Sequence, residues 1–368
     1  MRVGIELTPL TYALTGIGYY LRHLVQELAS LIPSGDLHGF IAGFRKLEHD
    51  NAAIPYCRLP VPPRLLNVMW AWGGWPRVDV RLGGVDLYHA VNYMLPPLDC
   101  ARGVLSIHDL GFLREPGWSS PGTHRLFGRH IQRHALRADA VIACSRATKR
   151  DIISLLGVEE KRVHVIYDAA DASFSPVNRN DAKRRVREAL GIEAPYLLFV
   201  STIEARKNVD GLLDAFARAD VPQKLVIAGV RGWGADDVIA RAETLKCSGR
   251  VVFTGYVPDR SLFPALYSAA DAFVFPSWHE GFGLAVLEAM ACGCPVISSN
   301  TSSLPEVGGD APFYVDPRDI TGLARTIEQV ATDEWLRENM REKGLVRARH
   351  FSWQKCAQET LACYRGLL

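Results

Sequence analysis

The sequence predicts an α/β protein built from two Rossmann-like domains, each with a parallel sheet. Two observations support this fold class. At 368 residues the chain exceeds one ordinary core and favours two domains of roughly 150 to 200 residues. Short runs rich in Val, Ile and Leu also alternate with helical stretches along the whole length, which is typical of parallel strands joined by crossover helices.

The apolar runs fall into two series. The first comprises RVGIEL, LHGFIAGF, VDLYHAV, GVLSIHDL, ADAVIACS and RVHVIY, and the second comprises PYLLFVST, KLVIAGV, RVVFTGYV, AFVFPS, CPVISSN and PFYVDP. The polar stretch 168–181 between them is the best candidate linker. We therefore expect domains at 1–173 and 174–352, with a boundary near Phe174. The terminal stretch is helical by periodicity, with an interruption at Gly344, and Ser352 caps a last helix, 353–368, that completes the first domain.

Composition bounds the class of protein. The net charge of +2 gives no reason to expect a nucleic-acid partner. Eight cysteines without a CxxC pair fit reduced thiols, and Cys292 and Cys294 are expected in the core. We expect no leader peptide, and no apolar run approaches the roughly 20 residues of a membrane-spanning helix. We expect a cytoplasmic protein that at most touches the inner membrane peripherally.

The strongest site candidate is HEGFGLAVLEAM, residues 279–290, which follows the strand AFVFPS. Glu280 lies in a Gly-rich loop, a helix begins near Leu284, and Glu288 lies about two turns along it, roughly 12 Å away. A helix N-terminus favours phosphate, and Gly283 lets the backbone approach closely. Two carboxylates around such a loop suit a nucleotide sugar, with an anionic middle and hydroxyl-rich ends. The alternative is a solvated Glu288 and a Glu280 stabilised by the helix dipole.

A second candidate is ARKN, just after the strand PYLLFV. Arg206 and Lys207 are expected to open an amphipathic helix, where two cations oppose the dipole and favour an anionic partner such as a diphosphate. The alternative is a solvated basic turn. No two aspartates are separated by one residue, so we expect no metal, and these cations would replace it. Gly16 and Gly18 begin a helix after the first strand, but Leu21 stands at the third position of the dinucleotide fingerprint and disfavours a dehydrogenase.

The first half offers weaker candidates. His108 and Asp109 follow the strand GVLSI, where a ligand would bind, although a structural histidine and a turn-capping aspartate are the alternatives. Basic residues recur every four positions, at Arg125, Arg129, Arg133 and Arg137. That face suits phosphate-bearing acceptors or anionic lipid, but a solvated face is favoured. The Trp-rich stretch 67–79 is expected to pack inside the domain rather than to face lipid.

These residues resemble the retaining glycosyltransferases of family 4, which have the GT-B fold of two facing Rossmann-like domains. The segment EGFGLAVLE looks like the family's E-x7-E motif, with support from TGIGYY, SIHDL, ADAVIACSRATKRDI, ARKN and TGYVPDRSL. The resemblance implies that Glu280 contacts donor sugar hydroxyls, that Glu288 binds ribose and that Arg206 and Lys207 neutralise the diphosphate. The other donor-side positions that it implies are Gly16, Gly18, His108, Tyr256, Val257, Phe282, Gly283 and Leu284. The acceptor or membrane side takes Asp109, Arg125, Arg129 and Arg133.

The chain departs from the family pattern at YDAAD, 167–171, where an Asn-Gly-Val-Asp turn is common, and at Ala285 and Thr202. Several segments, including HAVNYMLPP and SIHDLGFLREPGW, are similar to those of bacterial mannosyltransferases of O-antigen and exopolysaccharide assembly. That similarity implies GDP-mannose as co-substrate, a lipid-diphosphate-linked oligosaccharide as acceptor and no resident cofactor.

The expected mechanism is front-face substitution, in which the departing phosphate oxygen takes the acceptor proton and no side-chain base acts. A covalent intermediate on Asp109 is the competing mechanism. A UDP-sugar donor, an epimerase of the same fold, and a non-catalytic sensor or scaffold subunit are the alternative functions. Alanine at Lys207 or Glu280 is expected to abolish transfer while the fold survives.

Overall fold

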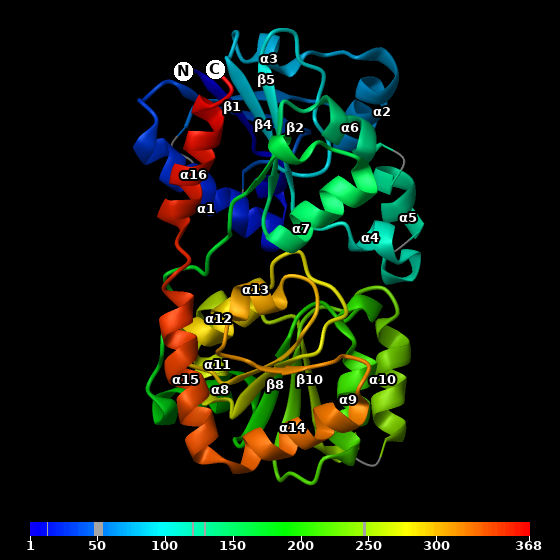
Figure 1. The fold of residues 1–368 in the computed structure, drawn as a ribbon, viewed down its shortest axis with the longest axis vertical. Coiled ribbons are helices and arrows are strands. Elements are labelled where there is room, and N and C mark those ends of the chain that lie inside the picture. Colours follow the sequence, from blue (N-terminus) through cyan, green and yellow to red (C-terminus); the bar gives the residue numbers. More distant parts are fainter. Residues whose placement is uncertain (13, 48–53, 120, 129, 246–247) are drawn as a thin grey trace. The chain divides into compact units, whose positions relative to one another are not determined.

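The computed structural model describes every residue except 13, 48–53, 120, 129 and 246–247. The chain divides into two compact units (Figure 1). The first unit comprises Met1–Leu113, Gly122–Asp168 and Ser352–Leu368, and the second comprises Arg114–Pro121 and Ala169–Phe351. The division after Asp168 precedes the boundary that we expected near Phe174. The grouping of 114–121 with the second unit was not anticipated.

The sheet of the first unit is parallel in the described part of the chain, with the order β3-β2-β1-β4-β5-β6-β7. Its strands are β1 (Val3–Glu6), β2 (Leu37–Ala42), β3 (Tyr56–Leu59), β4 (Leu87–Ala90), β5 (Arg102–Ile107), β6 (Ala140–Ala143) and β7 (Val163–Val165). All six apolar runs of the first series form strands, as predicted. The edge strand β3 was missed, because its residues YCRL are mixed in polarity and only partly buried.

Two long helices, α1 (Gly16–Leu31) and α16 (Trp353–Arg365), lie side by side on one face of this sheet (Figure 1). The opposite face is covered by α2 (Pro63–Gly73), α3 (Val78–Arg81), α6 (Ile131–Arg137) and the π-helical turn η4 (Ile152–Leu156). The remaining short elements are η1 (Thr8–Thr11), α4 (Gly111–Arg114), α5 (Pro121–Thr123), η3 (His124–Gly128), α7 (Arg146–Asp151) and η5 (Glu160–Arg162). Ser352 caps α16 by accepting the Lys355 amide, as predicted.

The second sheet is likewise parallel, with the order β10-β9-β8-β11-β12-β13. Its strands are β8 (Tyr196–Val200), β9 (Lys224–Ala228), β10 (Val251–Gly255), β11 (Ala272–Phe275), β12 (Val296–Ser299) and β13 (Phe313–Val315). Each run of the second series forms one of these strands, so the prediction of two Rossmann-like units with parallel sheets is confirmed.

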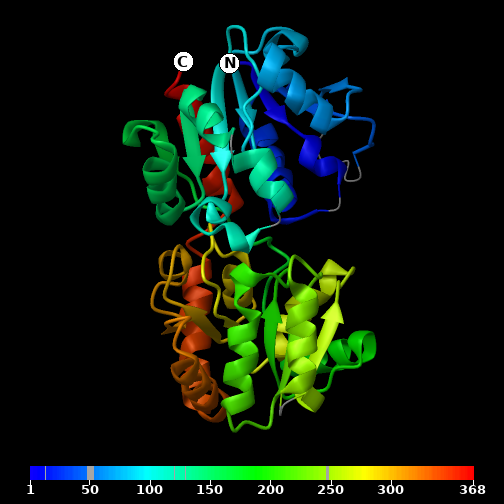
Figure 2. The same cartoon turned by 90° about the vertical axis from the view of Figure 1, so that its right-hand side faces the viewer.

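Helices cover both faces of the second sheet. One group pairs α8 (Arg179–Leu190) with α11 (Phe263–Ala269), and α12 (Leu284–Ala291) with α15 (Glu334–Ala348). The other group, α9 (Val209–Arg218), α10 (Ala235–Thr244) and α14 (Ile320–Thr332), packs on the opposite face, and Figure 2 shows α9 and α10 in front of the strands. The short elements are η2 (Pro116–Trp118), η6 (Ala205–Lys207), η7 (Ser248–Arg250), η8 (Arg260–Leu262) and α13 (Leu304–Gly308).

Two helix predictions need correction. Gly344 does not interrupt the helix but lies inside α15, where a Cβ would stand 3.3 Å from Met290 Cγ, so the glycine permits close packing on α12. The basic face expected from Arg125 to Arg137 does not lie on one helix, because the segment divides into η3 and α6. His134 is buried, and Arg137 donates to the carbonyls of Leu95 and Pro96. The Arg125 side chain and Arg129 lie outside the described residues.

The remaining predictions about buried residues are confirmed only in part. Trp70 is buried, and Cys292 and Cys294 lie in the core, as expected. Trp75, in contrast, is 57% exposed, so the Trp-rich stretch is only partly packed.

Candidate glycosyl-donor site

The candidate site lies in the loop between β11 and α12 of the second unit, at the carboxyl end of a parallel strand, where ligands bind in open α/β sheets. Gly283 has a φ of 102°, and a Cβ there would lie 2.7 Å from Leu304 Cδ2, so only glycine fits this turn. The helix α12 begins at Leu284, as predicted, and Gly293 follows its end in a left-handed conformation.

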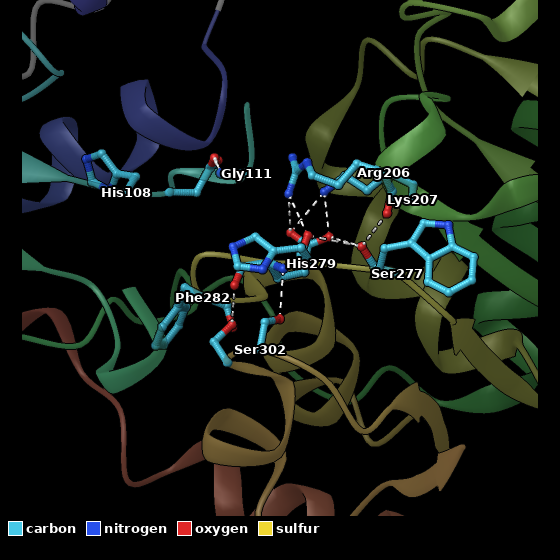
Figure 3. Close-up of polar contacts among 12 residues, drawn as sticks. His108, Gly111, Arg206, Lys207, Ser277, His279, Phe282 and Ser302 are labelled. Carbon is cyan, nitrogen blue, oxygen red and sulfur yellow. Dashed lines mark hydrogen bonds and ion pairs between the residues drawn. The ribbon is translucent and has the colours of Figure 1, made fainter. Parts of the chain in front are cut away.

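Arg206, Lys207 and Ser277 converge on this loop (Figure 3), where they surround the Glu280 carboxylate. Lys207 Nζ lies 2.7 Å from Oε1 and 2.9 Å from Oε2, and Arg206 Nη1 lies 3.3 Å from Oε2. The Ser277 hydroxyl lies 2.7 Å from Oε1. Glu280 is only 6% exposed and Lys207 only 7% exposed, so the carboxylate and the ammonium group form a buried ion pair.

The charges around Glu280 keep it ionised despite its burial. Burial alone would raise the pKa of this carboxyl, but the charges of Lys207 and Arg206, with hydrogen bonds from Lys207 and Ser277, lower the pKa to about 2. Glu280 therefore carries a negative charge throughout the physiological pH range, and both of its oxygens already accept hydrogen bonds within the cluster.

The placement of Arg206 and Lys207 corrects the sequence prediction. They form the 3-10 helix η6 rather than the first turn of α9, because Asn208 between the two elements has a φ of 54°. The Asn208 amide donates to the carbonyls of Pro276 and Pro317, which fixes this turn beside the loop after β11. Arg206 also contacts Glu204 Oε1 at 2.9 Å. The two cations are thus held mainly by carboxylates and do not oppose a helix dipole.

Glu288 occupies the second position of the predicted carboxylate pair. It lies on α12, is 8% exposed, and accepts from Arg260 at 2.7 Å and from the Tyr267 hydroxyl at 3.5 Å. Burial raises the pKa of Glu288, and Arg260 offsets only part of that effect. The alternative of a solvated Glu288 is therefore wrong, while its role toward ribose stays a prediction.

The other donor-side positions differ in exposure. Phe282 is buried against the Phe351 ring at 5.8 Å, and its carbonyl accepts from the Ser303 hydroxyl at 2.8 Å. Val257 is buried, whereas Tyr256 is 64% exposed. The structure therefore leaves Tyr256 accessible and makes Val257 a packing residue of the second unit.

In the first unit, His108 follows β5, and its Nε2 lies 3.2 Å from the Val91 carbonyl. The Tyr20 ring packs edge-on against it at 4.6 Å, and burial lowers the pKa of His108 to about 4, so its imidazole is neutral at neutral pH. Asp109 Oδ1 accepts the Gly111 amide at 3.0 Å, which confirms the turn-capping alternative.

Gly16 and Gly18 differ in the space around them. Gly16 begins α1 in open space, whereas a Cβ on Gly18 would lie 2.9 Å from Leu14 Cδ2. Gly16 is thus accessible at the helix start, and Gly18 is required for close packing.

One group of potential metal ligands occurs among the described residues. The ligand atoms of His108, Cys144 and Asp168 all lie within 4.8 Å of one another. Burial raises the pKa of Asp168 to about 8 and raises that of the Cys144 thiol, so both groups are largely protonated at neutral pH. A metal ion bound here would have to displace these protons.

Two family models match the chain, "Glycosyl transferases group 1" over residues 181–347 and "Glycosyltransferase Family 4" over residues 14–174. The chain is also 31% identical, over the full length of both proteins, to the O-antigen chain mannosyltransferase B of Escherichia coli. The chain belongs to the group 1 and family 4 glycosyltransferases. It is therefore a glycosyltransferase.

Solved structures show the GT-B fold of this glycosyltransferase. The sucrose-phosphate synthase of Thermosynechococcus elongatus has a TM-score of 0.78 at 22% identity, and the match covers 100% of this chain and 98% of that one. The Anabaena protein HepE in complex with UDP and glucose has a TM-score of 0.75 at 19% identity, with 98% of each chain covered. At such identities the likeness concerns the fold alone.

Sequence reasoning missed several side chains of the glycosyltransferase site. Ser277 and Glu204 contact Glu280 and Arg206, and Arg260 pairs with Glu288, but none stands in a pattern that the sequence marks as functional. Trp118, from the short segment 114–121, stacks on His279 with ring centroids 6.0 Å apart and an interplanar angle of 23°. The sequence could not predict this contact, because segment 114–121 belongs to the second unit although it lies within the first half of the chain.

Across the described residues, no helix has both the length and the apolar character that spanning a bilayer requires.

Proposed function

We propose that this glycosyltransferase moves mannose from GDP-mannose to a glycan or lipid-diphosphate-linked acceptor in bacterial surface polysaccharide synthesis, with retention of anomeric configuration. The observation that carries the proposal is the 31% identity to an O-antigen chain mannosyltransferase over the whole of both chains. A UDP-sugar donor is the alternative, since the fold neighbour HepE was solved with UDP and glucose. A lipid-linked acceptor would also place the enzyme in peripheral contact with the inner membrane.

The proposed donor site uses the cluster around Glu280. Lys207 and Arg206 would neutralise the donor diphosphate, and the start of α12 would add its positive partial charge. Glu280 would accept hydroxyls of the donor sugar, and Glu288 those of ribose. We propose that the reaction needs no metal, because two cations are already held in the loop where the diphosphate would bind.

Front-face substitution is the proposed mechanism. The bond from the anomeric carbon to the diphosphate breaks, the acceptor oxygen bonds to that carbon on the same face, and the departing oxygen takes the acceptor proton. Stabilisation of the leaving group by a preorganised donor is worth roughly 3 kcal/mol in enzymes of other kinds. The competing covalent route through Asp109 is less favoured, because the Gly111 amide already donates to Oδ1 and reduces its nucleophilicity.

The decisive experiment supplies the purified chain with labelled GDP-mannose or UDP-glucose and a lipid extract as acceptor source, and then determines the anomeric configuration of the product. Glu280→Gln tests the site, and Glu160→Gln is the control, because the Glu160 side chain is 77% exposed in the first unit. Transfer from GDP-mannose with retention, lost only in the Glu280 variant, supports the proposal. Inversion, or transfer only from UDP-glucose, contradicts it.

An epimerase and a sensor subunit would each behave differently in this assay. An epimerase would change the configuration of the sugar in donor supplied without acceptor, and a sensor subunit would bind nucleotide without turnover. Intact charge pairs at Glu280 and Glu288 favour an active site over a degenerate one.

A further inference from the structure

Three side chains with metal-binding atoms follow three neighbouring strands of the first sheet. His108 comes directly after β5, Cys144 directly after β6, and Asp168 three residues after β7. Because these strands are adjacent and parallel, their carboxyl ends meet at the same edge of the sheet. One ligand atom from each of the three side chains therefore lies within 4.8 Å of the other two, although the residues are far apart in the sequence.

The cluster lies inside the first unit and contains an unsatisfied acceptor. Cys144 and Asp168 are each 4% exposed, and His108 is partly buried. Asp168 Oδ1 is buried and has no hydrogen-bond partner among the described residues. A carboxyl oxygen in that position is costly unless a donor or a cation meets it. The orphaned oxygen therefore points to a ligand beside this carboxyl group.

The imidazole of His108 is oriented like that of a metal ligand. Its Nε2 lies 3.2 Å from the Val91 carbonyl, an acceptor that calls for the ring hydrogen on Nε2 and leaves the lone pair on Nδ1. A histidine that binds metal through one nitrogen usually donates the other N–H to a carbonyl or carboxylate, which fixes the tautomer. The Tyr20 ring, packed edge-on at 4.6 Å, further restrains this side chain.

The mixture of ligand atoms favours zinc. Imidazole nitrogen, thiolate sulfur and carboxylate oxygen are all common ligands of Zn²⁺, whereas Ca²⁺ and Mg²⁺ prefer oxygen alone. With bonds of about 2.0 to 2.3 Å in a tetrahedral site, ligand atoms stand roughly 3.3 to 3.8 Å apart, so the cluster needs to contract by at most about 1.5 Å. Water would occupy the fourth position.

Charge balance suits the buried position. Burial raises the pKa of the Cys144 thiol and of the Asp168 carboxyl, so each carries a proton at neutral pH. Zn²⁺ would replace these two protons, which leave to water, and the net charge of the interior would not change. The hydrogen bond of 3.0 Å from Cys144 Sγ to the His108 carbonyl would be lost with the thiol proton.

We propose that His108, Cys144 and Asp168 bind one zinc ion, which braces the carboxyl ends of β5, β6 and β7. The role is structural, so it is separate from the diphosphate site and does not depend on the proposed donor or acceptor. It departs from the family resemblance, which implies no resident cofactor. Because the ligands come from three strands, the bound ion would stabilise the first unit and fix the His108 ring.

Titration of the full chain with Zn²⁺ and Co²⁺, after treatment with a chelator, tests the proposal. We expect one zinc ion per chain, and with Co²⁺ the near-ultraviolet charge-transfer absorption of a bond between cobalt and thiolate. Cys144→Ser should abolish that absorption, and Asp168→Asn should weaken zinc at least about tenfold, the loss that outer-shell partners alone can cause. The control Cys100→Ser, which replaces an exposed free cysteine, should change neither result.

Melting temperatures separate loss of a ligand from loss of the fold. Zinc should raise the melting temperature of the unmodified chain, whereas Asp168→Asn should melt normally without metal and respond little to zinc. No thiolate absorption in the unmodified chain, absorption that survives Cys144→Ser, or undiminished zinc affinity in Asp168→Asn would overturn the proposal. The cobalt spectrum of the unmodified chain decides even if both variants fail to fold.

Discussion

Replacing Lys207 with methionine will destabilise the second unit by about 3 kcal/mol at neutral pH, because it leaves the buried Glu280 carboxylate short of its main partner. The magnitude follows from the cost of breaking a buried ion pair. Removing one member of such a pair costs roughly 3 to 5 kcal/mol, and Arg206 and Ser277 still contact Glu280, which favours the lower end. The lowered pKa of Glu280 agrees in sign, because the charges of Lys207 and Arg206 favour the ionised carboxylate.

The sign of the pH dependence provides a second signature. Because the pKa of Glu280 is lowered in the folded state, its stabilising contribution is complete above 4.5 and is lost as the pH falls through about 2. Without Lys207 the pKa of Glu280 rises, so the acid loss becomes smaller and moves to higher pH.

Denaturant unfolding followed by far-ultraviolet circular dichroism measures the effect. The matched control is Lys161→Met, which removes an ion pair of 2.9 Å whose lysine is 80% exposed, and it should change stability by less than about 1 kcal/mol. The double variant Lys207→Met with Glu280→Gln should recover part of the loss, because no uncompensated charge remains buried. If Lys207→Met unfolds like the unmodified chain, or the double variant is no better than the single one, the buried pair does not hold this loop.

Three further outcomes are expected. Ser352→Ala removes the cap of α16 and will lower the free energy of unfolding of the first unit by about 1 kcal/mol, whereas Ser30→Ala, which loses only a bond to the Glu27 carbonyl, will cost less; chemical denaturation compares them. Burial, with a smaller contribution from His108, lowers the pKa of His89 to about 3. The first unit will therefore lose stability as the pH falls from 6.5 toward 3, and His89→Asn should reduce this pH dependence of the unfolding free energy in acid unfolding curves. At 100 times its dissociation constant, the correct nucleotide will stabilise the chain by about 2.7 kcal/mol in thermal-shift assays; a larger effect of UDP or ADP than of GDP would contradict the proposed donor.

The fold was largely predictable because burial on both faces of a parallel sheet leaves a direct record in the sequence. Runs such as YLLFV and KLVIA are predicted as strands because every position except Lys224 is apolar or aromatic. The edge strand β3 carries no such record, because one side of an edge strand faces solvent and YCRL mixes polar with apolar residues.

The site was predictable in its members but not in its contacts. The Gly-rich loop and the helix start at Leu284 follow local rules, and the structure places both as expected. The pair of Lys207 with Glu280 joins residues 73 positions apart, and it forms because β8 and β11 are neighbours in the sheet, an order that local sequence does not state. The left-handed turn at Asn208, which keeps Lys207 out of α9, likewise depends on carbonyls of distant segments.

The charge balance of the Glu280 cluster bears on product release under the proposed function. A donor diphosphate would meet Lys207 and Arg206 while each already faces a carboxylate, Glu280 for the lysine and both Glu280 and Glu204 for the arginine. Because the low pKa of Glu280 keeps that charge in place, the diphosphate would share the cations rather than capture them, and its ground-state binding would be weaker than two unpaired cations provide. The charge that appears on the leaving oxygen during bond cleavage would draw the same cations more strongly, so this arrangement favours the transition state over the bound product and lets the nucleotide leave.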